Sequence, residues 1–251
     1  VWLGVLGPVI RAEVGDTVRI NFCNRSQTGS YGMHPHGMKY SKDNEGAAYT
    51  GMNGQPAGAG AQVIPGACFT YTWIADQGAG PANGEVSSKV WWYHSHIDEP
   101  AETSRGLLGA IIVTRKDMAK ADGSPIDVDK EFIVSFFVHD ELGGLEEGLL
   151  HSMNGYIYGN LPGLVMKKDD RVRWHLIGMG NEVDLHTPHR HGETATIGAK
   201  DIARRTDVVE LLPASMVTAD MKTDNPGEWL FHCHVADHLH AGMMATYQVL
   251  P

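Results

Sequence analysis

The residues of this chain best suited to chemistry are histidines in closely spaced groups. The chain has 14 histidines against 20 lysines and arginines, and only three cysteines. Side chains two residues apart in an extended strand point the same way, so a His-x-His pair can bring two imidazoles to one metal ion or to a close pair of ions. Four such groups occur: His34-Pro-His36-Gly, His94-Ser-His96, His186-Thr-Pro-His189-Arg-His191, and His232-Cys233-His234 followed by His238 and Met243.

The fourth group offers metal ligands on both faces of one strand. His232 and His234 share one face and Cys233 points to the other, so a single tripeptide can join two metal sites. Two histidines, a thiolate and a weakly bound thioether form the ligand set of a blue-copper electron-transfer site. Met244 is an alternative thioether, although the spacing favours the methionine before it. The preferred set is His186, Cys233, His238 and Met243.

The elements that must position these groups are strands, repeated twice along the chain. Thirty glycines and 12 prolines separate short runs rich in valine, isoleucine, threonine and aromatic residues, which is typical of many strands joined by turns. The segment from Arg11 returns in outline at Lys168, and residues 90–96 return as residues 228–234. A period this long indicates duplicated domains, because solenoid repeats run at roughly 20 to 50 residues. The sequence therefore predicts an all-β protein of two tandem β-sandwiches.

The two copies of the repeat set the expected domain boundaries. We expect domain 1 over residues 1–116 and domain 2 over residues 130–251. Residues 117–129 are expected to be the linker, because they are polar and carry Asp-Gly and Ser-Pro turn signals. Helix signals are nearly absent, and residues 98–108 are expected to form one or two helical turns.

Composition and charge exclude several classes of protein. A length of 251 residues fits two domains of ordinary size, each able to bury its own core. A net charge of -10 would repel a phosphate backbone, so we expect no nucleic-acid partner. No apolar run approaches the ~20 residues needed to cross a bilayer, so no membrane span is expected.

The four histidine groups resemble the copper-binding motifs of multicopper oxidases. His-Pro-His-Gly, His-Ser-His, His-x-x-His-x-His and Asn-Pro-Gly-Glu-Trp-Leu-Phe-His-Cys-His-x-x-x-His-x-x-x-x-Met occur in the order and spacing of that family, across nearly the whole chain. The length and the duplicated sandwich are similar to those of the two-domain, or small, laccases. This resemblance implies two cupredoxin-like Greek-key sandwiches and four copper ions per chain: one type 1, one type 2 and two type 3.

The resemblance also implies which histidines bind which copper. The type 1 copper would take the blue-copper set given above. The type 2 copper would take His34 and His189. The type 3 pair would take one set of His36, His94 and His234 and a second set of His96, His191 and His232. Ser95 stands in domain 1 where Cys233 stands in domain 2, so only domain 2 can hold the blue copper.

The resemblance implies a laccase-type activity, in which phenolic or related organic substrates lose single electrons at the type 1 copper. Dioxygen is then reduced to water by four electrons at the trinuclear cluster. Electrons would enter at His238 and cross Cys233 to its two neighbouring histidines. Oxygen reduction consumes protons, so a carboxylate relay is expected. Glu45 matches the acidic position of the family, and Asp43 is the local alternative.

The eight cluster histidines are divided between the two domains, so they must meet across a domain interface. In the resembling family this interface lies between neighbouring chains of a head-to-tail homotrimer, although an interface within one chain would satisfy the same ligand count. The expected partners are dioxygen and a small reducing substrate such as a phenol. A secreted or periplasmic location follows from the family.

Three rival functions stay open. A metallo-oxidase acting on Cu(I) or Fe(II) is favoured by His-Gly-Met-Lys-Tyr and Asn-Glu-Gly-Ala, which resemble ceruloplasmin-type domains, and disfavoured by the absence of a Met-rich segment. A copper nitrite reductase would need a cysteine at Ser95 and fewer cluster histidines. A non-catalytic electron-transfer cupredoxin has no use for paired His-x-His motifs. Cys23 and Cys68 form either a disulfide or two buried thiols.

Overall fold

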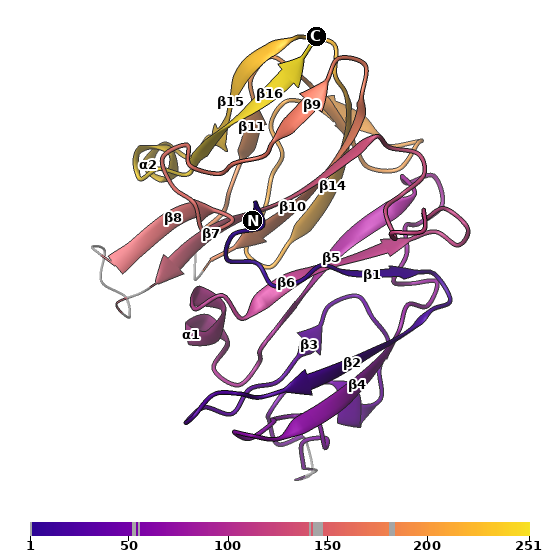
Figure 1. The fold of residues 1–251 in the computed structure, drawn as a ribbon, viewed down its shortest axis with the longest axis vertical. Coiled ribbons are helices and arrows are strands. Elements are labelled where there is room, and N and C mark those ends of the chain that lie inside the picture. Colours follow the sequence, from indigo (N-terminus) through magenta and orange to yellow (C-terminus); the bar gives the residue numbers. More distant parts are fainter. Residues whose placement is uncertain (1, 52–53, 55, 141, 143–147, 181–183) are drawn as a thin grey trace.

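Strands account for most of the regular structure of this protein (Figure 1). The computed structural model describes residues 2–51, 54, 56–140, 142, 148–180 and 184–251. The first domain contains β1 (Ile10–Glu13), β2 (Thr17–Cys23), β3 (His34–Pro35), β4 (Cys68–Ile74), β5 (Ser88–His94) and β6 (Leu108–Thr114). The short helices η1 (Lys42–Asn44) and α1 (Glu99–Ser104) lie between these strands in sequence.

The second domain is the larger of the two. It contains β7 (Lys130–Asp140), β8 (Leu149–Met153), β9 (Val165–Lys167), β10 (Arg171–Met179), β11 (Pro188–Arg190), β12 (Ala195–Ile197), β13 (Arg204–Thr206), β14 (Met216–Lys222), β15 (Gly227–Cys233), α2 (Ala236–His240) and β16 (Met244–Leu250). Its sheets have the orders β13-β12-β14-β10-β7-β8 and β11-β15-β16-β9. The sheets of the first domain have the orders β1-β6-β5-β3 and β2-β4.

The strand pairings repeat between the domains, as the internal sequence repeat predicts. The parallel pair β1–β6 corresponds to the parallel pair β9–β16, and the antiparallel pair β2–β4 corresponds to β10–β14. His34 lies opposite His94 in the β3–β5 pair, as His189 lies opposite His232 in the β11–β15 pair. The prediction of two tandem cupredoxin-like Greek-key sandwiches is therefore confirmed.

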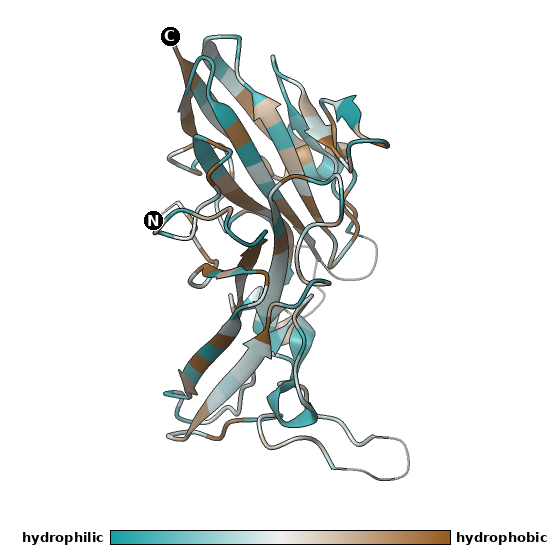
Figure 2. Ribbon diagram, turned by 90° about the vertical axis from the view of Figure 1, so that its right-hand side faces the viewer, coloured by the Kyte–Doolittle hydropathy of each residue, from teal (hydrophilic) through white to brown (hydrophobic). Residues whose placement is uncertain are grey.

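Hydropathy explains why some strands have one buried face and others two. Residues of β2 alternate between exposed and partly buried along Thr17–Cys23, which fits a strand with one face in solvent, and Figure 2 shows such striping. Strand β6 is buried at every residue from Leu108 to Thr114. The reason is that β5 and β6 also pack against the second domain, where Val90, Trp92 and Ile112 share a core with Ile133 and Ile177.

A buried guanidinium reinforces this contact between the domains. Arg173 on β10 is fully buried and donates hydrogen bonds to Ser87 and Ser88 of the first domain, at 2.8 and 2.9 Å. It also pairs with the carboxylates of Asp127 at 3.1 Å and Asp220 at 2.7 Å. A buried charge is tolerated only when it is paired and hydrogen-bonded, so this network ties the linker region and both domains together.

The expected helical turns form where the sequence places them. Helix α1 begins at Glu99, with Pro100 in its first turn, where the missing amide hydrogen costs nothing. Gly106 follows the helix with φ at +86°, a conformation that suits glycine. Among the described residues, no helix is long and apolar enough to cross a membrane.

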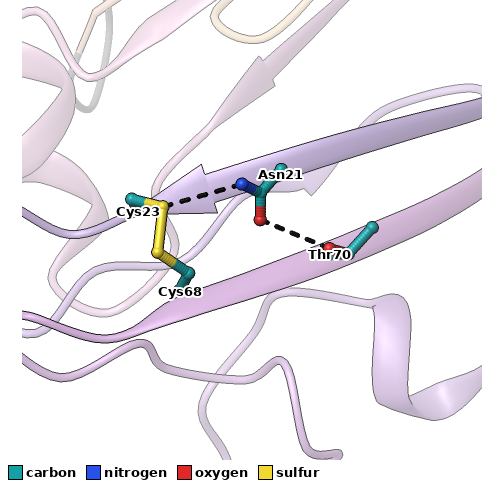
Figure 3. Close-up of a disulfide and its surroundings, with 4 residues drawn as sticks. All are labelled: Asn21, Cys23, Cys68 and Thr70. Atoms are coloured by element: carbon teal, nitrogen blue, oxygen red, sulfur yellow. Dashed lines mark hydrogen bonds between the residues drawn. A yellow bond between two sulfur atoms is a disulfide. The ribbon is translucent and has the colours of Figure 1, made fainter.

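A disulfide joins the two cysteines that the sequence left undecided. Cys23 at the end of β2 lies directly opposite Cys68 at the start of β4, and the two sulfur atoms are bonded (Figure 3). Asn21 donates from Nδ2 to Cys23 Sγ at 3.8 Å and accepts from Thr70 at 3.3 Å. Cys233 is free and buried.

We predict that the metal-free protein, unfolded without reductant, contains one reactive thiol per chain. Replacing both Cys23 and Cys68 by serine removes a cross-link between residues 45 apart and should lower the free energy of unfolding by about 2–4 kcal/mol. Thiol titration and denaturant unfolding measure the two effects. Three reactive thiols in the wild-type protein would contradict the pairing.

Candidate metal centre

The second domain contains a buried group of two histidines and a cysteine. The ligand atoms of His186, Cys233 and His238 all lie within 4.8 Å of one another. Cys233 Sγ is 3.6 Å from His238 Nδ1 and accepts a hydrogen bond from the backbone amide of Thr187 at 3.4 Å. Cys233 and His186 are fully buried, and His238 is nearly so.

The polar atoms of this pocket fit a metal ion. His186 Nε2 donates to the carbonyl of Met179 at 2.7 Å, which leaves Nδ1 buried with no hydrogen-bond partner. A buried polar atom without a partner is costly unless it binds something, and a metal-bound histidine commonly donates its other nitrogen to a carbonyl in this way. Burial raises the pKa of the Cys233 thiol, so a metal that binds here must displace a proton.

The two candidate thioethers occupy different positions. Met243 is fully buried and belongs to the same core as Cys233. Its backbone carbonyl accepts from the Cys233 amide at 3.1 Å, and its amide donates to the carbonyl of His238 at 2.9 Å. Met244 lies in β16 opposite His232. Backbone hydrogen bonds therefore tie Met243, and not Met244, to two of the three other predicted ligands, Cys233 and His238.

The first domain gathers its four motif histidines into one group, the domain 1 half-site (His34, His36, His94 and His96). The Nε2 atoms of His36 and His94 are 3.2 Å apart. The His34 ring lies 5.4 Å from that of His36 and 5.2 Å from that of His96, centroid to centroid. The other nitrogens of His34 and His94 hydrogen-bond to the carbonyls of Glu45 and Ser95, at 2.7 and 2.8 Å. The Nε2 atoms of these two rings are thus left to face the group.

The second domain contains the matching domain 2 half-site (His189, His191, His232 and His234). His191 Nε2 and His232 Nε2 are 3.1 Å apart, and the ring centroids of His189 and His234 are 5.4 Å apart. His232 Nδ1 hydrogen-bonds to the carbonyl of Cys233 at 2.7 Å, as His94 Nδ1 does to Ser95. The same local geometry therefore recurs in both domains.

Burial keeps most of these imidazoles neutral, which is the form that binds metals. Burial, together with the neighbouring His34 and His96, lowers the pKa of His36 to about 4. Burial lowers the pKa of His94 to about 3 and that of His186 to about 4. His94 and His232 donate from Nδ1 to carbonyls, so the Nε2 atom of each can accept from the neighbouring imidazole or bind a cation.

The two half-sites do not meet within one chain. Figure 1 shows β3 in the lower half of the molecule and β11 and β15 in the upper half. Each set of histidines has ring contacts within its own domain, and no ring contact joins the two sets among the residues described. The contact between the domains is made chiefly by β5 and β6 against β7 and β10, and Trp92 of this contact stacks on His94. Each half-site has four histidines of its own domain.

Glu45 lies beside the domain 1 half-site, but its carboxylate points to other partners. Its backbone carbonyl accepts the His34 hydrogen bond, while its carboxylate pairs with Lys42 and accepts from Tyr49 Oη at 2.9 Å. Burial raises the pKa of Glu45, and the bonds to Lys42 and Tyr49 outweigh it, so the net pKa is lowered. Asp43, the alternative, accepts from the amide of Ala59 at 2.9 Å.

The structure adds one residue that the sequence did not single out. His151 on β8 lies with its ring centroid 4.9 Å from that of His238, and its Nδ1 is buried without a hydrogen-bond partner. Burial and His151 lower the pKa of His238, whereas Asp184 and Asp237 raise it. His151 and the carboxylates of Asp184 and Asp237 are thus near enough to His238 to influence its charge. His151 belongs to no spaced motif, so no sequence signal marks it.

The chain matches two family models described as multicopper oxidase, over residues 4–118 and 138–251. This protein belongs to the multicopper oxidase family. The human ferroxidase HEPHL1 and human hephaestin are each 38% identical to it, over 277 and 274 residues. Human ceruloplasmin is 37% identical over 273 residues. These alignments cover 99% of this chain but 23%, 23% and 25% of the relatives, so the chain spans about a quarter of their length.

Solved structures of similar size share the fold. A structure described as a multicopper oxidase superposes with a TM-score of 0.77 at 24% identity, covering 97% of this chain and 78% of that one. The blue copper oxidase of Nitrosomonas europaea gives 0.74 at 25% identity, covering 96% and 76%. The copper nitrite reductase of the same organism gives 0.72 at 20% identity, covering 98% and 84%.

We predict that Cys233→Ser abolishes the intense visible absorption of the copper-loaded protein and removes one copper per chain, because it deletes the thiolate from the buried pocket. Absorption spectra and elemental analysis measure this. Met244→Leu is the matched control and should keep both the colour and the copper. A variant without Cys233 that stays blue would contradict the pocket.

We predict that the metal-free protein loses stability as the pH falls from 6.5 to about 4. The pKa values of His36, His94 and His186 are lowered to about 4, 3 and 4 in the folded state, so in this range the unfolded chain binds protons that the folded chain does not. Their stabilising contribution is complete above pH 6.5 and decreases toward pH 4. Denaturant unfolding should report a loss of at least about 1 kcal/mol. A free energy of unfolding that stays constant over this range would contradict the assignment.

Proposed function

We propose that this multicopper oxidase binds a type 1 copper in the buried pocket and a trinuclear copper cluster between two half-sites. The type 1 ligands would be those of the predicted set: His186, Cys233, His238 and Met243. The convergence of two neutral imidazoles and a thiol around the unpartnered Nδ1 of His186 carries this assignment. Bound copper would supply one-electron transfer at the first site and oxygen reduction at the second.

The chain's own part in this chemistry is to hold the two sites at a fixed separation and to control access. Cys233 is bonded directly to His232 and His234, so the pocket and the domain 2 half-site share one strand. The carbonyls that accept from His94 and His232 fix the orientation of those rings. Glu45, whose backbone carbonyl accepts a hydrogen bond from His34, is the proposed proton relay.

We propose a reduced metal ion, Fe(II) or Cu(I), as the reducing substrate, in preference to a phenol. One of the similar proteins is named a ferroxidase, and the residues around His238 support a metal-ion substrate as well. A cation that approaches His238 would meet the His151 imidazole and the negative field of Asp184 and Asp237. Imidazole and carboxylate ligands suit such ions.

We propose that the trinuclear cluster forms between chains, in a closed head-to-tail ring of identical subunits such as a trimer. Each chain carries one half-site of each kind, and a heterologous interface that closes on itself uses both kinds in every subunit. The buried contact between the two domains supports this arrangement, because the Arg173 network and the shared core hold the half-sites apart. The disulfide favours an oxidising location, secreted or periplasmic.

Oxygen uptake by the copper-loaded protein tests the substrate. We expect faster turnover on Fe(II) or Cu(I) than on a methoxyphenol, with four electrons consumed per dioxygen and no peroxide released. His151→Ala should lower kcat/KM for the metal ion by about 10- to 100-fold and leave phenol oxidation unchanged. His175→Gln replaces a buried histidine elsewhere in the second domain and is the control. Equal losses on both substrates after His151→Ala would contradict a metal-ion site.

Subunit mixing tests the location of the cluster. His36→Ala disables the domain 1 half-site and His191→Ala disables the domain 2 half-site, so neither variant alone should reduce oxygen. Mixed and reassembled together, the two variants should regain part of the wild-type activity, because some interfaces then join two intact half-sites. A mixture that stays inactive, although light scattering shows mixed oligomers, would contradict a cluster between chains.

A further inference from the structure

Strand β2 of the first domain is paired along one edge only. Among the described residues, it pairs with β4 and with no other strand. Its counterpart β10 pairs with β14 in the same antiparallel way and also with β7, which runs parallel to it. The segment that precedes β1, residues 2–9, contains no strand that could take the place of β7. The two-stranded sheet of the first domain therefore has a free edge at β2.

The backbone of β2 offers hydrogen-bonding groups along this free edge. The Cα atoms of Cys23 and Cys68 are 4.0 Å apart, the close spacing of a residue pair that exchanges no backbone hydrogen bonds across an antiparallel ladder. Alternate residues share this orientation, so the amides and carbonyls of Arg19, Asn21 and Cys23 point away from β4. In the described part of the chain, these groups make no backbone hydrogen bond to another segment. Such a row of unpaired groups is a template for a further strand.

An apolar groove of about 560 Å³ lies beside this edge. Ile20 and Phe22 of β2 line one side of the groove, and Ile10, Tyr93 and Leu107 line the other. The isoleucines and Phe22 are only half-buried, and Leu107 is 38% exposed, so the groove is open to solvent. Apolar side chains gathered in an open groove are typical of a surface that a partner covers.

The second domain fills the corresponding space with a side chain of β7. The ring of Phe136 is fully buried and lies 5.5 Å from that of Phe231 and 6.1 Å from that of His186, centroid to centroid. The internal repeat matches Phe231 with Tyr93 and His186 with Tyr31, because the members of each pair have the same offset from the histidine motifs. Tyr93 and Tyr31 both line the groove. The groove is thus the space that a strand like β7 occupies in the second domain.

We propose that the groove and the free edge of β2 bind an extended polypeptide segment, which adds to the sheet as a strand parallel to β2. The chemistry of the segment is that of β7, in which alternate apolar residues enter the core of the sandwich: Phe132, Val134, Phe136 and Val138. Backbone hydrogen bonds to β2 supply affinity, and the apolar side chains in the groove supply selectivity. This inference does not rest on the proposed oxidase function, because no copper ion takes part in the binding.

The bound segment comes from outside these 251 residues. The β7 strand of the chain itself is paired with β10 along one edge and with β8 along the other. A second copy of the chain therefore has no free strand of the β7 pattern to donate. The occupant is a separate extended segment with alternating apolar residues, such as Phe-x-Val-x-Phe-x-Val.

A labelled peptide tests the binding directly. The probe is a fluorescein-labelled peptide with the sequence of residues 130–140, added to the metal-free protein. We expect a saturable rise in fluorescence anisotropy. The control peptide has Val134→Pro, which removes an amide hydrogen from the middle of the added strand and should bind at least about tenfold more weakly. A wild-type protein that binds neither peptide, or both equally, would overturn the proposal.

Hydrogen exchange and two pairs of variants test the location. Bound peptide should slow amide exchange at Arg19, Asn21 and Cys23. Asn21→Pro removes the outward amide of β2 and should weaken peptide binding by at least about tenfold, whereas Asn21→Ala keeps that amide and should bind as the wild type does. Leu107→Lys places a charge in the groove and should also weaken binding. Ile64→Lys is its control, because Ile64 is exposed but does not line the groove.

Three results would overturn the proposal. Peptide binding that leaves the β2 amides unprotected would contradict strand addition. An affinity unchanged by both Asn21→Pro and Leu107→Lys would place the peptide elsewhere. A metal-free protein that self-associates, and that the peptide converts to monomers, would identify a second copy as the occupant. Oxygen uptake is not needed for any of these measurements, so they are independent of the proposed oxidase activity.

Discussion

Side chains alternate along β15, and this alternation governs both proposed metal sites of the second domain. His232 faces one way and Cys233 the other, because successive residues of a strand point to opposite faces. Cys233 therefore enters the core of the second sandwich, among Phe231, Met243 and Tyr247, while its neighbours reach the half-site. The tripeptide therefore connects the two proposed metal sites by covalent bonds.

The elements around residues 232–234 place the other histidines of both sites. Strand β11 pairs with β15, so His189 lies opposite His232. Helix α2 follows β15, and its His238 comes within 3.6 Å of Cys233 Sγ. Met243 lies between α2 and β16 and is hydrogen-bonded through its backbone to Cys233 and His238. The four proposed type 1 ligands come from different segments of the second sandwich, so the pocket depends on the packing of the whole domain.

Duplication of the sandwich gave the two domains different tasks. In both domains a strand pair places two histidines opposite each other. In both, the second histidine, His94 or His232, is oriented by the backbone carbonyl of the next residue. Only the second domain keeps the cysteine. The surface that joins the domains contains the buried Arg173 and the core around Trp92. Trp92 also stacks against His94, so this core supports the domain 1 half-site from behind.

Much of this organisation could be predicted from the sequence because it depends on short-range periodicity. The His-x-His spacing predicts that His34 and His36, and likewise His94 and His96, project together, and the repeat predicts that the two domains share one frame. Contacts between residues distant in sequence produce no periodic pattern from which they could be predicted. The approach of His151 to His238 depends on β8 pairing with β7 at the edge of its sheet, and the Cys23–Cys68 bond depends on the β2–β4 register. The orientation of the Glu45 carboxylate is set by its bonds to Lys42 and Tyr49, and the spacing of residues in the sequence does not reveal those bonds.

In the proposed assembly, each trinuclear cluster takes its histidines from two copies of this chain. Anomalous diffraction at the copper edge, from crystals of the fully loaded protein, would locate the copper ions. We expect one copper in the pocket of Cys233 and three more per chain, each of the three lying between the domain 1 half-site of one copy and the domain 2 half-site of another. Copper ions bound within a single half-site, with no second copy of the chain facing them, would contradict it.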